Sequence, residues 1–191
     1  RVITGLKRRV GESEGAYRRI VIINHIVSSC RRSASITGGV GITSAQPKPV
    51  DPIFPGGRRE DHDVKAGDAA CRETHEEIGL ELRREDLAGC LGELRGRHGG
   101  RSADLVISCF VFSINEIPTL EPNHEVSEIV RIPLSRLLEP HLQTSVRYDA
   151  AGGMRFPGIF LDKDDERVIW GLTYRFLRQL FSLLGHQLPA D

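Results

Sequence analysis

The sequence feature that most restricts the fold is an apolar run at residues 104–114, DLVISCFVFSI. Its Ile, Val and Phe content is typical of a β-strand, and few polar side chains interrupt it, so we expect this strand to lie at the centre of a sheet. The pattern also predicts strands at 19–28, 87–94 and 125–132, an extended segment at 154–161 interrupted by Pro157, and a short helix at 133–138.

Two longer helices accompany these strands. Residues 64–78 have a helical pattern that Asp61 or Asp63 could cap at its start, and Gly79 stands where a helix commonly ends. Residues 168–184 predict an amphipathic helix, with one apolar side made up of Ile169, Leu172, Phe176, Leu180 and Leu183. Strands that alternate with helices predict an α/β layered domain.

Length and charge limit the domain count and the classes of partner. The 191 residues suffice for one domain, which we place at 19–188 after a basic segment at 1–18. The formal net charge of zero leaves no overall field that would attract nucleic acid, and no apolar run is long enough to span a membrane, so we predict neither partner. The basic segment either faces a polyanionic substrate or is a solvated tail or a targeting remnant.

The cysteines indicate the compartment. Cys30, Cys71, Cys90 and Cys109 are far apart in the sequence, form no C-x-x-C pair and lie in or near apolar runs. Buried, reduced thiols are typical of an intracellular protein, and we expect the cytoplasm. The sequence begins with Arg1 rather than Met, so organelle targeting through a preceding segment is left open.

The most informative motif is a set of three glutamates in the helix predicted at 64–78. Glu73, Glu76 and Glu77 are spaced i, i+3 and i+4, which places three carboxylates on one helix face. Their mutual repulsion is relieved if they bind a cation, and hard oxygen ligands suit Mg2+ or Mn2+ better than zinc. The alternative is a solvated acidic face. The FPGG turn at 54–57 favours the metal site, because its exposed backbone can approach a metal or a phosphate.

This segment resembles the Nudix signature, G-x5-E-x7-R-E-U-x-E-E-x-G-U, in which U is aliphatic. The matching residues are Gly57, Arg72, Glu73, Glu76, Glu77, Gly79 and Leu80. Three details depart from it: residues 58–71 contain one residue more than the pattern, Asp63 stands for its first glutamate, and Thr74 fills an aliphatic position.

With these departures, FPGGxxxxxD followed by RETxEExGL and one extra residue between them, the segment resembles the coenzyme A pyrophosphatase branch of the Nudix family. Residues 169–173, IWGLT, resemble the IWGxT element of that branch, and residues 125–134 resemble its E-V…P-L turn. The branch also has an LLTxRS stretch shortly before FPGG, whereas this chain reads GITSAQPKPVDPIFPGG there. The pair Arg31-Arg32 resembles its Arg-Ser piece but lies further upstream. This chain therefore has either a long insertion or a different substrate.

The resemblance implies a Nudix-type α/β/α sandwich with a mixed sheet and a hydrolase that cleaves a diphosphate linkage. Coenzyme A or its thioesters are the expected substrates, with ADP-ribose or a nucleoside triphosphate as alternatives, and a non-catalytic ligand-binding module as the alternative to an enzyme. A homodimer is left open.

The resemblance also implies roles for individual residues. We expect Mg2+ or Mn2+ to be held by the Gly57 carbonyl, Glu73, Glu76 and Glu77, with Glu73 or Glu77 as the general base. Arg72 would orient a carboxylate in the catalytic site. The remaining candidates are Asp63 as a support residue or helix cap, and Arg31 and Arg32 for substrate binding. Glu125 or Glu128 is either a further metal ligand or a residue at a solvated strand end.

Overall fold

The computed structural model describes residues 19–28, 54–98, 101–148 and 152–190, which contain two antiparallel sheets of three strands each. The first sheet has the order β1-β3-β2, and the second has the order β4-β5-β6. The strands are β1 (Arg19–Ser28), β2 (Leu87–His98), β3 (Arg101–Ile114), β4 (Gln143–Tyr148), β5 (Met154–Phe160) and β6 (Val168–Trp170). The helices are α2 (Ala66–Ile78), α3 (Gly171–Leu183) and the 3-10 turns η1 (Arg84–Asp86), η2 (Arg136–Leu138) and η3 (Pro140–Leu142).

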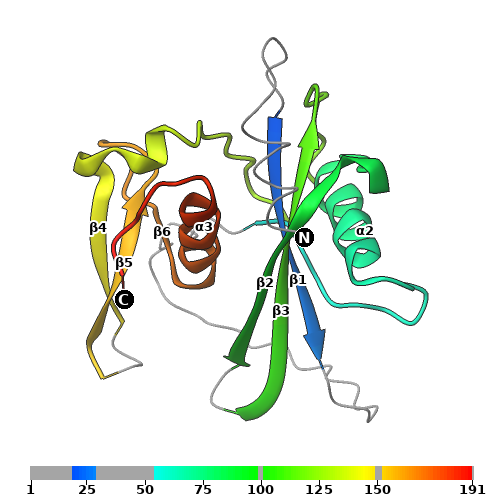
Figure 1. Ribbon diagram of the computed structural model, residues 1–191, viewed down its shortest axis with the longest axis horizontal. Coiled ribbons are helices and arrows are strands. Elements are labelled where there is room, and N and C mark those ends of the chain that lie inside the picture. Colours follow the sequence, from blue (N-terminus) through cyan, green and yellow to red (C-terminus); the bar gives the residue numbers. More distant parts are fainter. Residues whose placement is uncertain (1–18, 29–53, 99–100, 149–151, 191) are drawn as a thin grey trace.

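Strand β3 is the central strand of the first sheet, as its apolar sequence predicts. Successive strand residues face opposite sides, so a strand that is apolar throughout must be covered on both faces. Ile107, Cys109 and Val111 belong to a core cluster that includes α3, whereas Phe110 and Phe112 belong to a second cluster with α2. Figure 1 shows the resulting layers, with α3 between the two sheets and α2 on the opposite face of the first sheet. The α/β class is therefore confirmed.

Helix α2 begins two residues later than the sequence predicts and is not capped by Asp61 or Asp63. Its first turn is closed by Asp68, whose carboxylate accepts a hydrogen bond from the backbone N–H of Lys65 at 2.8 Å. Gly79 ends the helix in the left-handed conformation at φ 69°, as predicted, because a residue without Cβ adopts it at no steric cost.

Several boundaries differ from the sequence-based prediction. The strand expected at 125–132 is irregular, and β4 was not predicted. Strand β5 continues through Pro157, which is tolerated because pairing with β6 starts only at Gly158. The helix expected at 168–184 starts at Gly171, since its first three residues form β6.

The strand directions also differ from the expected mixed sheet. Within the described ranges, every strand pair is antiparallel.

None of the helices in this part of the chain is long and apolar enough to cross a membrane.

Candidate active site on helix α2

Arg72, in the middle of α2, is the centre of an ion-pair network that reaches the loop before the helix. Its Nη2 lies 3.1 Å from Oδ2 of Asp63 and also donates to the carbonyl of Arg58 at 2.9 Å. Its Nη1 lies 3.0 Å from Oε1 of Glu73 and 3.1 Å from Oε2 of Glu76. One guanidinium therefore joins the loop before the helix to two of the three glutamates, which restricts their orientations.

Asp63 is the buried anchor of this network, with 3% of its side chain exposed. Its Oδ2 also accepts the backbone N–H of Glu60 at 2.8 Å, and the side chain of Arg59 donates to its carbonyl at 2.8 Å. Burial alone would raise the pKa of the Asp63 carboxyl, but the hydrogen bonds from Arg72 and Glu60 outweigh burial and lower it. Asp63 thus supports Arg72 rather than capping the helix.

The FPGG turn lies against two of the glutamates. A Cβ added at Gly57 would collide with the carboxylate of Glu73, so this position accepts only glycine while Glu73 keeps its place. The backbone N–H of Gly56 bonds to the carboxylate of Glu77. The turn therefore brings backbone polar groups to the acidic face of α2.

Glu77 is partly buried and has other carboxylates nearby. Partial burial raises the pKa of its carboxyl, and the nearby carboxylates of Glu73, Glu125 and Glu76 raise it further, while the Gly56 amide acts in the opposite direction. An ionised carboxylate among other carboxylates is stabilised by a nearby cation.

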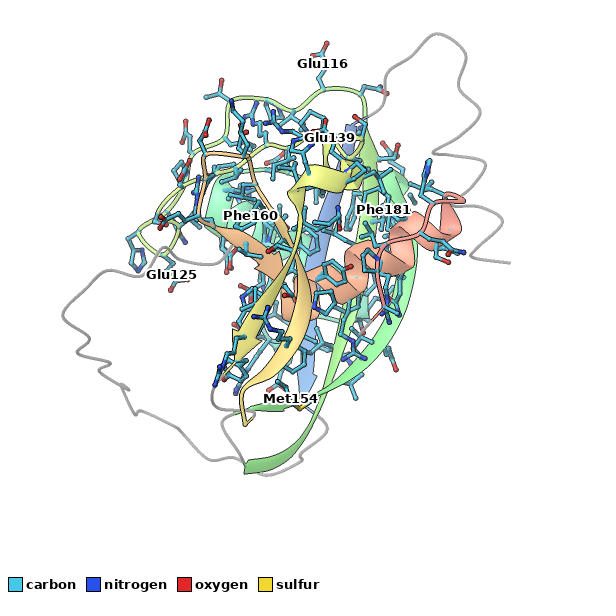
Figure 2. The ribbon with its side chains drawn as sticks, turned by 90° about the vertical axis from the view of Figure 1, so that its left-hand side faces the viewer. Glu116, Glu125, Glu139, Met154, Phe160 and Phe181 are labelled. Carbon is cyan, nitrogen blue, oxygen red and sulfur yellow. The ribbon has the colours of Figure 1, made fainter. Side chains whose placement is uncertain are left out.

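Glu125 reaches this region on the loop that follows β3. The loop is bound to the end of α2 by the backbone N–H of Asn123, which donates to the carbonyl of Glu77 at 2.9 Å, and by that of Glu121, which donates to the carbonyl of Ile78 at 3.0 Å. These bonds satisfy carbonyl groups that have no partner within a helix end. Figure 2 shows Glu125 at the outer edge of this loop.

Comparison with known proteins settles the family. The NUDIX domain model matches residues 31–150 of the chain. The chain belongs to the Nudix family. It is 32% identical over 140 residues to the Arabidopsis thaliana protein named Nudix hydrolase 22, chloroplastic. The aligned residues cover 72% of this chain and 45% of that protein.

Two further relatives of this Nudix chain have the name mitochondrial coenzyme A diphosphatase NUDT8. The Homo sapiens protein is 31% identical over 125 residues, which cover 64% of this chain and 51% of the relative. The Mus musculus protein is 30% identical over 134 residues, which cover 69% and 61%. The chain therefore spans about half the length of the curated relatives it matches.

The donor chemistry of the Nudix glutamates fits a hard divalent cation, since carboxylate oxygens and backbone carbonyls are the ligands of Mg2+ and Mn2+. In the described part of the chain, no group of three or more His, Cys, Asp or Glu side chains is arranged so that it could hold a metal ion. Two of the glutamates, Glu73 and Glu76, are instead in contact with Arg72. The ligand set Gly57, Glu73, Glu76 and Glu77 remains a prediction.

The other predicted Nudix site residues fall into three groups. Arg31 and Arg32 lie outside the described residues. Glu125 is near Glu77, whereas Glu128 is bound by Arg167 at 2.6 Å. Thr74 fills its aliphatic position without cost, because it is fully buried and its hydroxyl donates to the Ala70 carbonyl at 2.7 Å.

Sequence reasoning missed two parts of the site. The contacts of Arg72 with the Arg58 carbonyl and of Asp63 with the Glu60 amide involve the backbone, which no residue pattern reveals. The pair Arg167–Glu128 joins residues 39 positions apart, and neither lies in the glutamate motif. Only the resemblance of residues 125–134 to the E-V…P-L turn of the coenzyme A pyrophosphatase branch indicated that this loop belongs to the site.

Proposed function

We propose that the chain is a divalent-metal-dependent pyrophosphohydrolase that cleaves the diphosphate linkage of coenzyme A or its thioesters. The products would be 3′,5′-ADP and the 4′-phosphopantetheine moiety. The observation that carries the proposal is the partly buried carboxylate of Glu77, which has the carboxylates of Glu73, Glu76 and Glu125 nearby and the Gly56 amide beside it. The names of two relatives support the choice of substrate.

The roles of the residues follow from their contacts. The Gly57 carbonyl, Glu73, Glu76 and Glu77 would hold Mg2+ or Mn2+, which when bound neutralises charge on the diphosphate oxygens. Arg72 fixes the carboxylates of Glu73 and Glu76 in orientation. Glu73 or Glu77 accepts the proton of the attacking water.

Asp63 would act only through Arg72. It holds two of the nitrogen atoms of the guanidinium and is itself nearly inaccessible to solvent. Loss of such a supporting contact typically costs about 10- to 100-fold in activity, which is less than the loss expected at a metal ligand or base.

Recognition of the 3′-phosphate of coenzyme A would require a basic group. We assign this role to Arg31 and Arg32, the basic pair that the sequence places before the FPGG turn. Dephospho-CoA should then be cleaved less well than CoA, because the arginines would lose their ionic partner.

The test is a substrate panel of CoA, acetyl-CoA, dephospho-CoA, ADP-ribose, NADH and nucleoside triphosphates, assayed with Mg2+ or Mn2+ and with products separated by chromatography. We expect CoA to be the best substrate and Glu73→Gln to abolish most of its cleavage. Equal cleavage of CoA and dephospho-CoA, or cleavage of ADP-ribose alone, would overturn the coenzyme A assignment. Binding without cleavage of any compound would identify a ligand-binding module instead.

We further propose that residues 19–188 form one Nudix domain with α/β/α sandwich layering, preceded by the basic segment at 1–18. Its partner would be a small nucleotide-like molecule and not a nucleic acid or a membrane, and a homodimer is the oligomer to test. The names chloroplastic and mitochondrial among the relatives support organelle targeting over the cytoplasm.

A further inference from the structure

Arg167, at the end of the connection between β5 and β6, is bound on two sides by carboxylates. Its Nη2 and Nε contact Oδ2 of Asp165 at 2.7 and 3.1 Å, and its backbone N–H donates to Oδ1 of the same residue at 2.9 Å. Its Nη1 lies 2.6 Å from Oε2 of Glu128. Asp165 thus fixes the guanidinium from its own turn, and the remaining nitrogen atom is directed to a distant loop.

That loop is the one that carries Glu125. Its first part is attached to the end of α2 through Glu121 and Asn123. The side chain of Asn123 also accepts the backbone N–H of Glu125 at 2.9 Å. Glu128, three residues further on, is the point that Arg167 holds. Glu125 therefore lies between two attachments.

The loop needs such attachments for two reasons. The described residues 121–128 form no helix or strand, so no regular hydrogen-bond ladder fixes their position, and ordering them costs conformational entropy. In addition, Glu125 is near the carboxylate of Glu77, and like charges repel. Val126 and Ile129 pack against the apolar cluster around α2, and the contact of Arg167 with Glu128 adds a polar attachment at the far end of the loop.

We infer that Arg167 is a positioning residue that, through Glu128, holds the 121–128 loop so that Glu125 faces Glu77 and completes the metal site. The inference rests on the proposed function, because Glu125 matters only if a cation binds there. Arg167 itself touches neither metal nor substrate in this account. A second ion pair, Arg136 with Asp162 at 2.6 Å, joins the same connection to η2.

Charge and position predict opposite effects when Arg167 is replaced. Removal of a positive charge from the neighbourhood of a cation site should strengthen cation binding through electrostatics alone. Loss of the attachment should weaken it, because Glu125 is no longer held near Glu77. Arg167→Gln therefore separates a positioning role from a simple charge effect.

The experiment measures Mn2+ affinity without substrate, by electron paramagnetic resonance of free Mn2+, in the full chain. The variants are Arg167→Gln, Arg167→Lys, Glu125→Gln and the double variant Arg167→Gln/Glu125→Gln. Glu128→Gln breaks the same contact from an exposed residue, although it also removes a negative charge. Arg167→Lys keeps the positive charge but cannot contact Asp165 and Glu128 in the same geometry, so it covers the case in which Arg167→Gln fails to fold. Arg83→Gln, at an exposed arginine that is paired with Glu85, is the matched control.

We expect Arg167→Gln and Glu128→Gln to weaken Mn2+ binding by about 2- to 5-fold, Arg167→Lys by less, and Arg83→Gln not at all. The double variant should bind Mn2+ no more weakly than Glu125→Gln, because both changes act through one carboxylate. Unchanged or tighter binding in Arg167→Gln, or additive losses in the double variant, would overturn the positioning role alone. A wild-type chain that binds no Mn2+ would overturn the proposed function together with this inference.

Discussion

Arg72 and Arg167 each bind carboxylates from separate parts of the chain, but their surroundings differ. Asp63, the main partner of Arg72, has 3% of its side chain exposed, whereas Asp165 and Glu128, the partners of Arg167, have 23% and 59% exposed. An ion pair that excludes water is costly to break, while an exposed pair contributes little to stability. The first network is therefore a structural part of the acidic site, and the second acts on the position of a single loop.

The largest expected effect is on catalysis and separates the glutamates of α2 from Glu128. Glu77→Gln and Glu73→Gln should each lower turnover by about 10^3-fold, which corresponds to about 4 kcal/mol in the activation barrier. Glu128→Gln should lower turnover by less than 10-fold at saturating Mn2+, since Glu128 acts only on the loop. Steady-state rates on the best substrate of the panel measure this. Equal losses in Glu73→Gln and Glu128→Gln would remove the distinction between the networks.

The next largest effect is on the free energy of unfolding, which should fall more when Arg72 is replaced than when Arg167 is replaced. Arg72→Gln leaves the buried carboxylate of Asp63 without its ionic partner and should lower the free energy of unfolding by about 1–3 kcal/mol. Arg167→Gln should lower it by less, because its partners can be solvated in its absence. Urea denaturation in EDTA measures both, with Arg83→Gln as the control for an exposed arginine. A larger loss in Arg167→Gln than in Arg72→Gln would contradict the difference in burial.

The smallest effect is the dependence of stability on pH. The pKa values of Asp63 and Asp165 lie below the ordinary value of 3.8. A carboxyl with a lowered pKa in the folded state stabilises the fold fully above its unfolded pKa, and this contribution is lost as the pH falls below 3.8 through the folded value. Asp63→Asn and Asp165→Asn should each flatten the fall in stability at acidic pH. Thermal midpoints between about pH 2 and pH 6 measure it, and an unchanged slope in both variants would exclude these carboxyls as its source.

The elements that the sequence predicted well are those in which burial follows the residue periodicity of a strand or a helix. Strand β3 is apolar throughout because both of its faces are covered, and α2 ends at a glycine that must adopt a positive φ. The three glutamates were found in the same way, since helical spacing alone places them together. These features depend on residues that are close in the sequence.

The errors in secondary structure arose where the spacing of apolar residues does not reflect a buried strand or helix. Val126 and Ile129 pack against the cluster around α2 from an irregular loop, so their spacing resembled a strand without any strand partner. Strand β4 has a polar sequence, QTSVRY, because it lies at the edge of the second sheet. The contact of Arg167 with Glu128 depends on the tertiary fold and has no local signal in the sequence.

The most direct test of the central claim is the thermal midpoint of the wild type and of Glu77→Gln. Both proteins are measured in EDTA and in the same concentration of Mn2+, about ten times the dissociation constant of the wild type. Mn2+ should raise the wild-type midpoint by about 3–6 °C, because it binds only the folded chain. In EDTA, Glu77→Gln should melt at or above the wild-type temperature, since it removes a partly buried charge from among other carboxylates. In Mn2+ the order should reverse. A wild-type midpoint that Mn2+ leaves unchanged, or an equal rise in Glu77→Gln, would contradict a metal site at these glutamates.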